Sequence, residues 1–204
     1  MINLQNTFFE TAKTYSTDLV LIKNFGEEIE SLYSSQDRYY HNLFHLQNML
    51  VELTPLKEQI GNWDTIIFST FYHDSIYDVK MNDNEERSAL LAESRLKELN
   101  FSDINNCVAQ ILATKGHQKT EDNGINFFVD ADLSILGQEW DRYFEYCKQV
   151  RKEYEIYPDS IYNEGRKKVL NSFLQMNKIY KTPYFSEKYE SKARFNVMKE
   201  IDLL

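Results

Sequence analysis

The sequence predicts an all-α fold, and three observations support this prediction. The chain of 204 residues contains only 6 glycines and 3 prolines, which leaves little material for the tight turns between many short strands. In segment after segment, apolar residues recur three and four positions apart, the spacing that puts them on one face of a helix. The sequence contains no repeat, no low-complexity run and no long linker. We therefore expect a single domain over residues 1–204.

The expected elements follow from apolar spacing and from residues that start or stop helices. Asn24, Phe25 and Gly26 are expected to end a first helix, Ser102 and Asp103 are residue types that cap a helix start, and Gly116 is a type that ends one. Helices are expected over residues 4–22, 27–33, 43–53, 63–74, 85–99, 104–115, 140–154, 162–180 and 186–203, with polar loops over 78–84 and 118–126.

Composition and charge exclude several classes of protein. The formal net charge of -9 and the pI near 5.0 argue against a protein that binds duplex nucleic acid with a basic face. Cys107 and Cys147 form no CxxC motif and indicate no disulfide framework. The sequence has neither the pattern of a secretion signal nor an apolar run of about 20 residues, the length that crosses a bilayer. We therefore expect a cytoplasmic protein that does not enter membranes.

The histidines are unevenly placed. All four, His41, His45, His73 and His117, lie between positions 41 and 117. His41 and His45 are four residues apart, which puts both on one face of a helix, and His73 is followed by Asp74 at the end of an apolar run. Burial of such a pair is costly without an ion pair, hydrogen bonds or a metal. The pattern predicts that His45, His73 and Asp74 bind a divalent cation.

A fourth ligand is expected from the segment that contains Asp130 and Asp132. Residues two apart on a helix point to opposite sides, so only one of the two aspartates is expected to bind the cation. Two imidazoles with two carboxylates suit Mn, Fe, Co, Ni or Zn, and Mg when more waters complete the shell. Such a cation lowers the pKa of a bound water and polarises a phosphoryl oxygen, as hydrolysis of a phosphoester requires.

These motifs resemble the HD superfamily of metal-dependent phosphohydrolases, and more narrowly an uncharacterised bacterial subgroup of predicted phosphohydrolases. The resemblance runs from about Arg38 to the end of the chain, with a motif core over about 38–137 and C-terminal helices over 138–204. The motifs are Arg38-x-Tyr40-His41-x-x-x-His45, Phe71 through Asp78, Asn84-Glu85-x-x-Ser88-Ala89, Thr114-x-x-His117, Asp130 through Gly137, Gly165-Arg166-x-x-Val169-Leu170 and Ala193-Arg194-x-Asn196.

The resemblance implies an HD-type helical domain with a metal site in a central cleft. The first motif and the segment around Asp132 are also similar to cyclic-nucleotide phosphodiesterases, a distant branch of the superfamily. This similarity implies that His41 protonates the leaving oxygen, that His45 binds metal, and that Asp132 rather than Asp130 is the fourth ligand. The sequence lacks the longer second-metal set and the glutamine pocket of those enzymes, which argues against a cyclic nucleotide as the substrate.

Four other residues are candidates with structural alternatives. His117 is a second candidate proton donor, a phosphate contact or a ligand of a second cation, or it caps a helix end. Arg38 and Lys115 are candidate phosphate contacts or ordinary surface charges. Glu85 either orients a metal-bound water or a ligand histidine, or it is a first-turn carboxylate favoured by the helix dipole.

The expected function is cleavage of a phosphoester by a metal-activated water. The expected substrate is a small phosphorylated molecule, of the nucleotide kind that the resemblance implies. Two alternatives remain: a non-catalytic sensor of a nucleotide or phosphate that keeps the metal site, and an HD-type oxygenase with two irons, for which His117 is the only spare histidine. The aromatic C-terminal helices are compatible with a homodimer.

Overall fold

The computed structural model describes residues 2–204, which form ten α-helices and two short 3-10 helices, with no strand among them. The predicted all-α class is confirmed. The chain divides into two compact units, the first ending at Val129 and the second running from Asp130 to Leu204. Within the described part of the chain, every helix is too short or too polar to cross a membrane.

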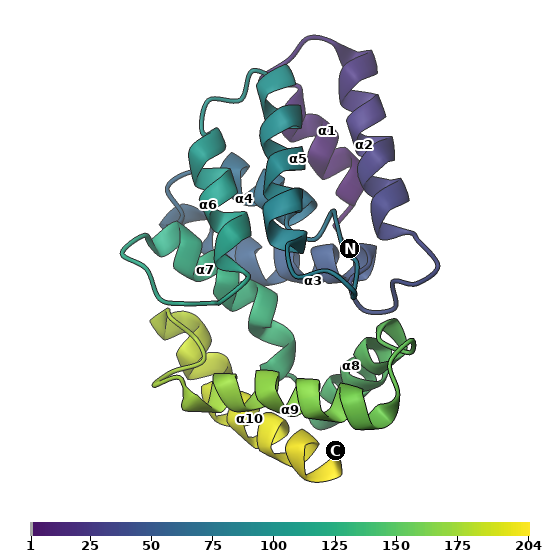
Figure 1. Ribbon diagram of the computed structural model, residues 1–204. Helices are drawn as coiled ribbons and strands as arrows, with labels where there is room; N and C mark the ends of the chain where they lie inside the picture. The colour runs from purple at the N-terminus through teal and green to yellow at the C-terminus, as the bar shows by residue number, and fades with distance from the viewer. Residues whose placement is uncertain (1) are drawn as a thin grey trace. The chain divides into compact units, whose positions relative to one another are not determined.

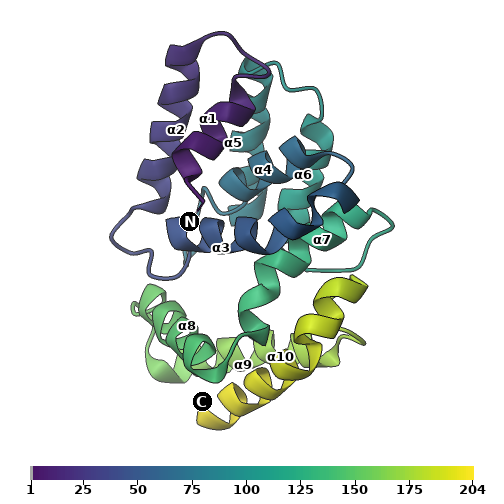
Figure 2. The ribbon, with the colours of Figure 1, turned by 180° about the vertical axis from the view of Figure 1, so that it is seen from behind.

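The first unit is built around one helix that is buried on all sides. Its helices are α1 (Leu4–Ala12), α2 (Leu19–Tyr33), α3 (Leu43–Leu53), η1 (Thr54–Gln59), α4 (Trp63–Tyr72), α5 (Asn84–Glu98), α6 (Ile104–Ala113) and most of α7 (Asn123–Asp132) (Figures 1 and 2). Every residue of α4 from Thr65 to Tyr72 is buried, and α1, α3, α5 and α6 pack against it. A helix that is apolar all round is expected at the centre of a domain.

The predicted first helix, residues 4–22, is wrong because the chain breaks between α1 and α2. Asp18 caps α2, its Oδ1 accepting hydrogen bonds from the backbone N–H of Val20 at 3.1 Å and of Leu21 at 3.0 Å. The break predicted at residues 24–26 lies instead within α2. Gly26 lies inside α2, where a Cβ would make only an ordinary van der Waals contact, 3.7 Å from Cδ1 of Phe8 on α1. The packing of α2 against α1 outweighs the weak helix propensity of this one glycine.

The other predicted helices agree more closely with the structure. The predicted 43–53 coincides with α3, and 85–99, 104–115 and 140–154 match α5, α6 and α8 (Trp140–Glu153) within two residues at each end. The predicted 162–180 is α9 (Asp159–Gln175), which begins and ends earlier. The predicted 186–203 begins three residues earlier as α10 (Pro183–Leu203), because proline is favoured in the first turn of a helix.

The second unit is organised by α10, which packs against η2 (Leu133–Gly137), α8 and α9 (Figure 1). A buried ion pair joins Arg166 on α9 to Glu200 on α10 at 2.8 Å, and the hydroxyl of Tyr143 on α8 donates to the same carboxylate. The three helices thus share one polar centre. Gly137 is required where η2 meets α10, because a Cβ there would lie 2.6 Å from Cδ1 of Tyr189.

Candidate metal site

The first ligand candidate, His45, is placed by the cap of α3. The side-chain Oδ1 of Asn42 accepts a hydrogen bond from the N–H of Phe44 at 2.8 Å, and its Nδ2 donates to the carbonyl of Tyr39 at 2.8 Å. Asparagine is among the preferred N-cap residues because it satisfies a backbone N–H that the helix leaves open. His45 therefore lies in the first turn of α3, with 3% of its surface exposed.

The second and third candidates, His73 and Asp74, follow the central helix. His73 is the C-cap of α4, and only 1% of its surface is exposed. The side chain of Asp74 is 18% exposed, so the pair extends from the core toward the surface. The local pattern predicted this position, because an apolar helix that ends in His-Asp puts both side chains at the core boundary.

Three ligand atoms from these residues converge. Nε2 of His45 lies 3.1 Å from Nε2 of His73, and Oδ2 of Asp74 lies 3.2 Å from Nε2 of His73 and 3.9 Å from Nε2 of His45. Among residues 2–204, these three form the one group of at least three His, Cys, Asp or Glu side chains close enough to share a metal ion. The predicted convergence of His45, His73 and Asp74 is therefore present.

The tautomer of His73 suits a metal ligand. Its Nδ1 lies 3.0 Å from the carbonyl oxygen of Thr70, and because a carbonyl only accepts, Nδ1 carries the proton and donates. In the neutral ring, Nε2 then presents its electron pair toward His45 and Asp74. A backbone carbonyl that fixes the outer nitrogen of a ligand histidine is a common feature of metal sites.

The donor set also fits a cation on electrostatic grounds. Two imidazole nitrogens and a carboxylate oxygen within 4.8 Å of one another need either a shared proton or a cation between them. A metal–nitrogen bond of about 2.0–2.1 Å puts neighbouring nitrogen ligands about 3.0–3.4 Å apart, and the 3.1 Å between the two histidines falls in this range. His45, His73 and Asp74 therefore fit a divalent transition metal.

His41 lies beside this group but outside α3. The prediction that His41 and His45 share a helix face is wrong, because Asn42 begins the helix after His41. The ring of His41 is nevertheless 5.8 Å from that of His45 between centroids, and it stacks on Tyr77 at 4.4 Å. Tyr40 packs edge-on against His41 at 4.9 Å. The backbone that precedes the cap brings the imidazole to the site, and Tyr77 fixes its plane.

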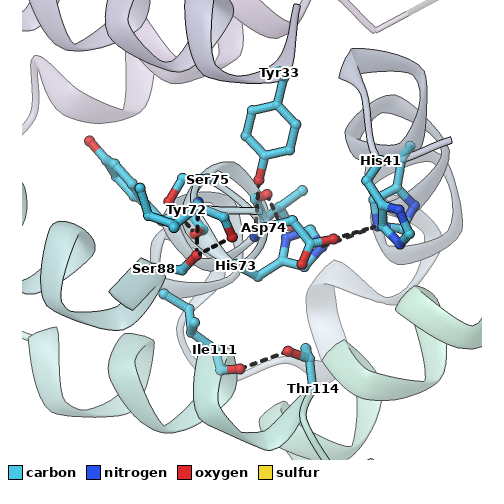
Figure 3. A network of polar contacts seen from close by, with 12 residues as sticks. Tyr33, His41, Tyr72, His73, Asp74, Ser75, Ser88, Ile111 and Thr114 are labelled. Atoms are coloured by element: carbon cyan, nitrogen blue, oxygen red, sulfur yellow. Dashed lines mark hydrogen bonds and ion pairs between the residues drawn. The ribbon is translucent and has the colours of Figure 1, made fainter. Parts of the chain in front are cut away.

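The irregular segment after α4 is held by side chains from other elements. The N–H of Asp74 donates to the hydroxyl of Tyr33 on α2 at 3.1 Å (Figure 3). The hydroxyl of Ser88 on α5 accepts from the N–H of Ile76 at 3.0 Å and donates to its carbonyl at 3.2 Å. In Figure 3, the Tyr33 hydroxyl points to the Asp74 backbone, while the Asp74 carboxylate points toward the histidine rings.

Arg38 is buried and bound to backbone oxygens. Its Nη1 donates to the carbonyls of His41 at 3.0 Å and of Asp74 at 2.7 Å, and its Nη2 donates to the carbonyl of Ser75 at 3.0 Å. Only 8% of the residue is exposed, so it is no ordinary surface charge, and these three bonds go to the chain's own backbone rather than to a solvent-facing phosphate subsite. Sequence reasoning missed this role because all three partners are main-chain atoms.

The remaining basic and acidic candidates lie in ordinary helix-end contacts. Lys115 is exposed, and its Nζ pairs with Glu86 at 2.5 Å and donates to the carbonyl of Asn82 at 2.8 Å. This ion pair raises the pKa of Lys115. Glu85 occupies the first turn of α5, where a carboxylate is favoured by the helix dipole. Both placements match the structural alternatives for these residues, and their catalytic roles stay predictions.

His117 ends the turn that follows α6. Its φ of 47° is left-handed, and its backbone N–H donates to the carbonyl of Ala113 at 2.9 Å. This is the helix-capping geometry that glycine usually adopts, although Gly116 is the residue before it. The backbone thus has the capping role, and a role for the His117 side chain at the site stays a prediction.

Asp130 has structural contacts within the second unit. Its Oδ1 accepts from the N–H of Lys181 at 2.7 Å, and its Oδ2 accepts from the N–H of Thr182 at 2.8 Å and from its hydroxyl at 2.7 Å. Thr182 is the N-cap of α10, so Asp130 anchors the start of that helix. Burial raises the pKa of Asp130 despite these bonds. Asp132 is the last residue of α7 and belongs to the second unit, and its role as the fourth ligand stays a prediction.

Comparison with known proteins does not extend this description. No protein-family model matches the chain, and neither a curated protein nor a solved structure matches it. The resemblance to the HD superfamily therefore rests on the motifs alone, and what the structure contributes is an all-α chain with His45, His73 and Asp74 grouped as in a metal site.

Proposed function

We propose that this protein is a metal-dependent phosphohydrolase that cleaves a phosphoester of a small, nucleotide-like molecule. One observation carries the proposal: two buried histidine nitrogens and an aspartate oxygen converge at the end of the central helix, with the tautomer of His73 fixed for ligation. The order of the motifs along the chain supports the same assignment.

In this proposal, His45, His73 and Asp74 hold the cation, and Asp132 completes the protein ligands. A bound divalent cation supplies Lewis acidity, which activates water and polarises the phosphoryl group. His41 is the preferred proton donor for the leaving oxygen, because its ring lies next to that of His45 and is held by Tyr77. Asp130 is the weaker choice as a ligand because its carboxylate anchors α10.

The first experiment measures bound metal in the protein purified without a polyhistidine tag, after reconstitution with Mn, Fe, Co, Ni, Zn or Mg. We expect about one cation per chain in the wild type and none in His73→Ala, with an unchanged far-ultraviolet circular dichroism spectrum. His117→Ala is the matched control, a histidine outside the convergent group, and is expected to keep the metal. Absence of metal in the wild type after every reconstitution would overturn the proposal.

A second experiment separates the two later aspartates. Asp132→Asn is expected to lower metal affinity without lowering thermal stability, whereas Asp130→Asn is expected to lower thermal stability and keep the affinity. The opposite result would make Asp130 the ligand.

A third experiment tests catalysis with a panel of nucleotides and simple phosphoesters. The metal-loaded wild type is expected to release phosphate or a phosphomonoester, and His41→Ala to lose activity while it keeps the metal. Tight binding of a nucleotide without turnover would replace the hydrolase with the sensor. A metal content of two per chain that depends on His117 would favour the oxygenase.

A further inference from the structure

We propose that Arg38 is a positioning residue that sets the spacing of the metal ligands by holding two backbone segments together. The first segment is the turn before α3, which leads into His45, and the second is the irregular stretch after α4, which begins with His73 and Asp74. The part of this inference that concerns the metal rests on the proposed function, and the part that concerns the backbone does not.

The contacts of Arg38 join these two segments directly. A single nitrogen, Nη1, donates to the carbonyl of His41 in one segment and to that of Asp74 in the other, and Nη2 donates to the carbonyl of Ser75. Arg38 is 36 residues before Asp74 in the sequence, so the short-range covalent structure of the chain does not set the distance between the two segments. The planar guanidinium therefore acts as a rigid spacer between the backbone of a ligand, Asp74, and the entry to the helix of another, His45.

Two tyrosines fix the guanidinium in place. Its carbon lies 4.8 Å from the ring centroid of Tyr33 and 5.3 Å from that of Tyr77. The same two rings act on the site itself, because the Tyr33 hydroxyl accepts from the N–H of Asp74 and Tyr77 stacks on His41. Arg38 is thus surrounded by groups that each contact a residue of the candidate site.

The need for three directed bonds makes this position specific for arginine. A guanidinium presents its donors in a fixed plane, whereas the ammonium of lysine is a compact group on a flexible stem. In Arg38→Lys the charge remains, but one ammonium nitrogen cannot occupy the positions of both Nη1 and Nη2, so the bonds to the carbonyls of His41, Asp74 and Ser75 cannot all be kept. We therefore expect the lysine variant to fold and to hold the ligands less well.

The experiment is a titration of the metal-free full chain with Co²⁺, followed through the visible absorption of the bound ion. We expect Arg38→Lys and Arg38→Ala to weaken Co²⁺ binding about 10- to 100-fold, the usual effect of removing a group that orients metal ligands. Guanidinium ion at a concentration too low to denature is expected to restore part of the affinity of Arg38→Ala and to leave the wild type unchanged.

Arg95 provides a matched control in the same unit. It is also a partly buried arginine with several side-chain bonds, which pair it with Glu28 at 2.7 Å through Nε and Nη2, and its guanidinium lies 5.2 Å from the ring centroid of Phe25. Arg95→Ala is expected to lower thermal stability and to leave Co²⁺ affinity unchanged. If the affinity of the Arg38 variants falls only as far as that of Arg95→Ala, Arg38 is a general stabilising residue and the inference is wrong.

Hydrogen exchange of the metal-free protein supplies a readout that does not depend on the metal. In Arg38→Lys, the amides of residues 74–76 are expected to exchange faster than in the wild type, while those of α6 stay unchanged. If the wild type fails to bind Co²⁺, the proposed function is contradicted, and the hydrogen-exchange measurement alone decides whether Arg38 holds the two segments together. Unchanged exchange and unchanged affinity in both Arg38 variants would overturn it.

Discussion

The buried pair of Arg166 and Glu200 gives a quantitative prediction for the second unit. Their side chains are 8% and 5% exposed, and Nε and Nη2 of Arg166 donate to the two carboxylate oxygens at 2.8 Å and 3.1 Å. Nη2 also donates to the hydroxyl of Tyr146 at 3.1 Å. Replacing Glu200 with glutamine keeps the shape of the side chain but leaves the buried charge of Arg166 without a counter-ion.

The expected loss is large. Removing one partner of a buried pair costs about 3–5 kcal/mol in free energy of unfolding, because the other charge stays desolvated and uncompensated. A domain of ordinary stability has only about 5–15 kcal/mol in total. The double replacement Arg166→Met with Glu200→Leu removes both charges and is expected to cost far less than either single change, since no unpaired charge remains.

Urea denaturation followed by tryptophan fluorescence measures these values. The chain has two tryptophans, Trp63 in the first unit and Trp140 in the second, so a Trp63→Phe background reports the second unit alone. If Glu200→Gln lowers the free energy of unfolding by less than about 1 kcal/mol, the buried pair stabilises the fold no more than an exposed ion pair does, and the reasoning is refuted.

The pH dependence of the same pair has a definite sign. Burial alone would raise the pKa of Glu200, but the hydrogen bond and the charge of Arg166 outweigh it and hold that pKa below its ordinary value. Because the folded pKa is depressed, the stabilisation is present above the unfolded pKa of about 4.3 and is lost as the pH falls through the folded pKa. The difference in stability between wild type and Glu200→Gln should therefore narrow as the pH is lowered below about 4.

Three further substitutions test packing and hydrogen bonding. Gly137→Ala is expected to lower the free energy of unfolding by about 1–3 kcal/mol, since the new methyl group would meet Tyr189. At Gly165 nothing lies within 4 Å of an added Cβ, so Gly165→Ala should instead raise the free energy of unfolding by about 0.5–1 kcal/mol in the same urea assay. If the two glycine variants change the free energy of unfolding equally, the packing argument is contradicted. Tyr72→Phe should raise the free energy of unfolding by about 1 kcal/mol, because the buried hydroxyl has no hydrogen-bond partner among residues 2–204. In Figure 3 this hydroxyl points away from His73. A clear loss of stability in Tyr72→Phe would show that the hydroxyl is satisfied.

Sequence reasoning predicts most of the helices because their signals are local. Apolar spacing and Asn42 determine where α3 begins, and the prediction for this helix was correct at both ends. The first helix is mispredicted because the chain breaks at the cluster Ser16-Thr17-Asp18, whereas Gly26 continues the helix. Those three are residue types of loops and helix caps, and Asp18 does cap α2.

In the candidate site, too, the residues with a local sequence signal are predicted and those whose role depends on the folded chain are not. The sequence predicts His73 and Asp74 together because they are neighbours, and it predicts His45 because it lies four residues from another histidine. The roles of Arg38, Tyr33 and Thr70 were not predicted, since each acts through a main-chain atom whose position depends on the folded chain. A histidine at a helix C-terminus can reach a carbonyl three residues back, which is the one signal that could have identified Thr70.

The backbone contacts of Arg38 have a consequence for protein engineering. Every amino acid carries a carbonyl, so the bonds from Arg38 to positions 41, 74 and 75 do not depend on which side chains occupy them. The side chain of His41 also lies before the cap of α3, so changing it does not shift the helix that carries His45. A combinatorial library at position 41 therefore varies the proposed proton donor while the backbone bonds of Arg38 stay in place, and position 77 is kept as tyrosine because its ring packs against the guanidinium.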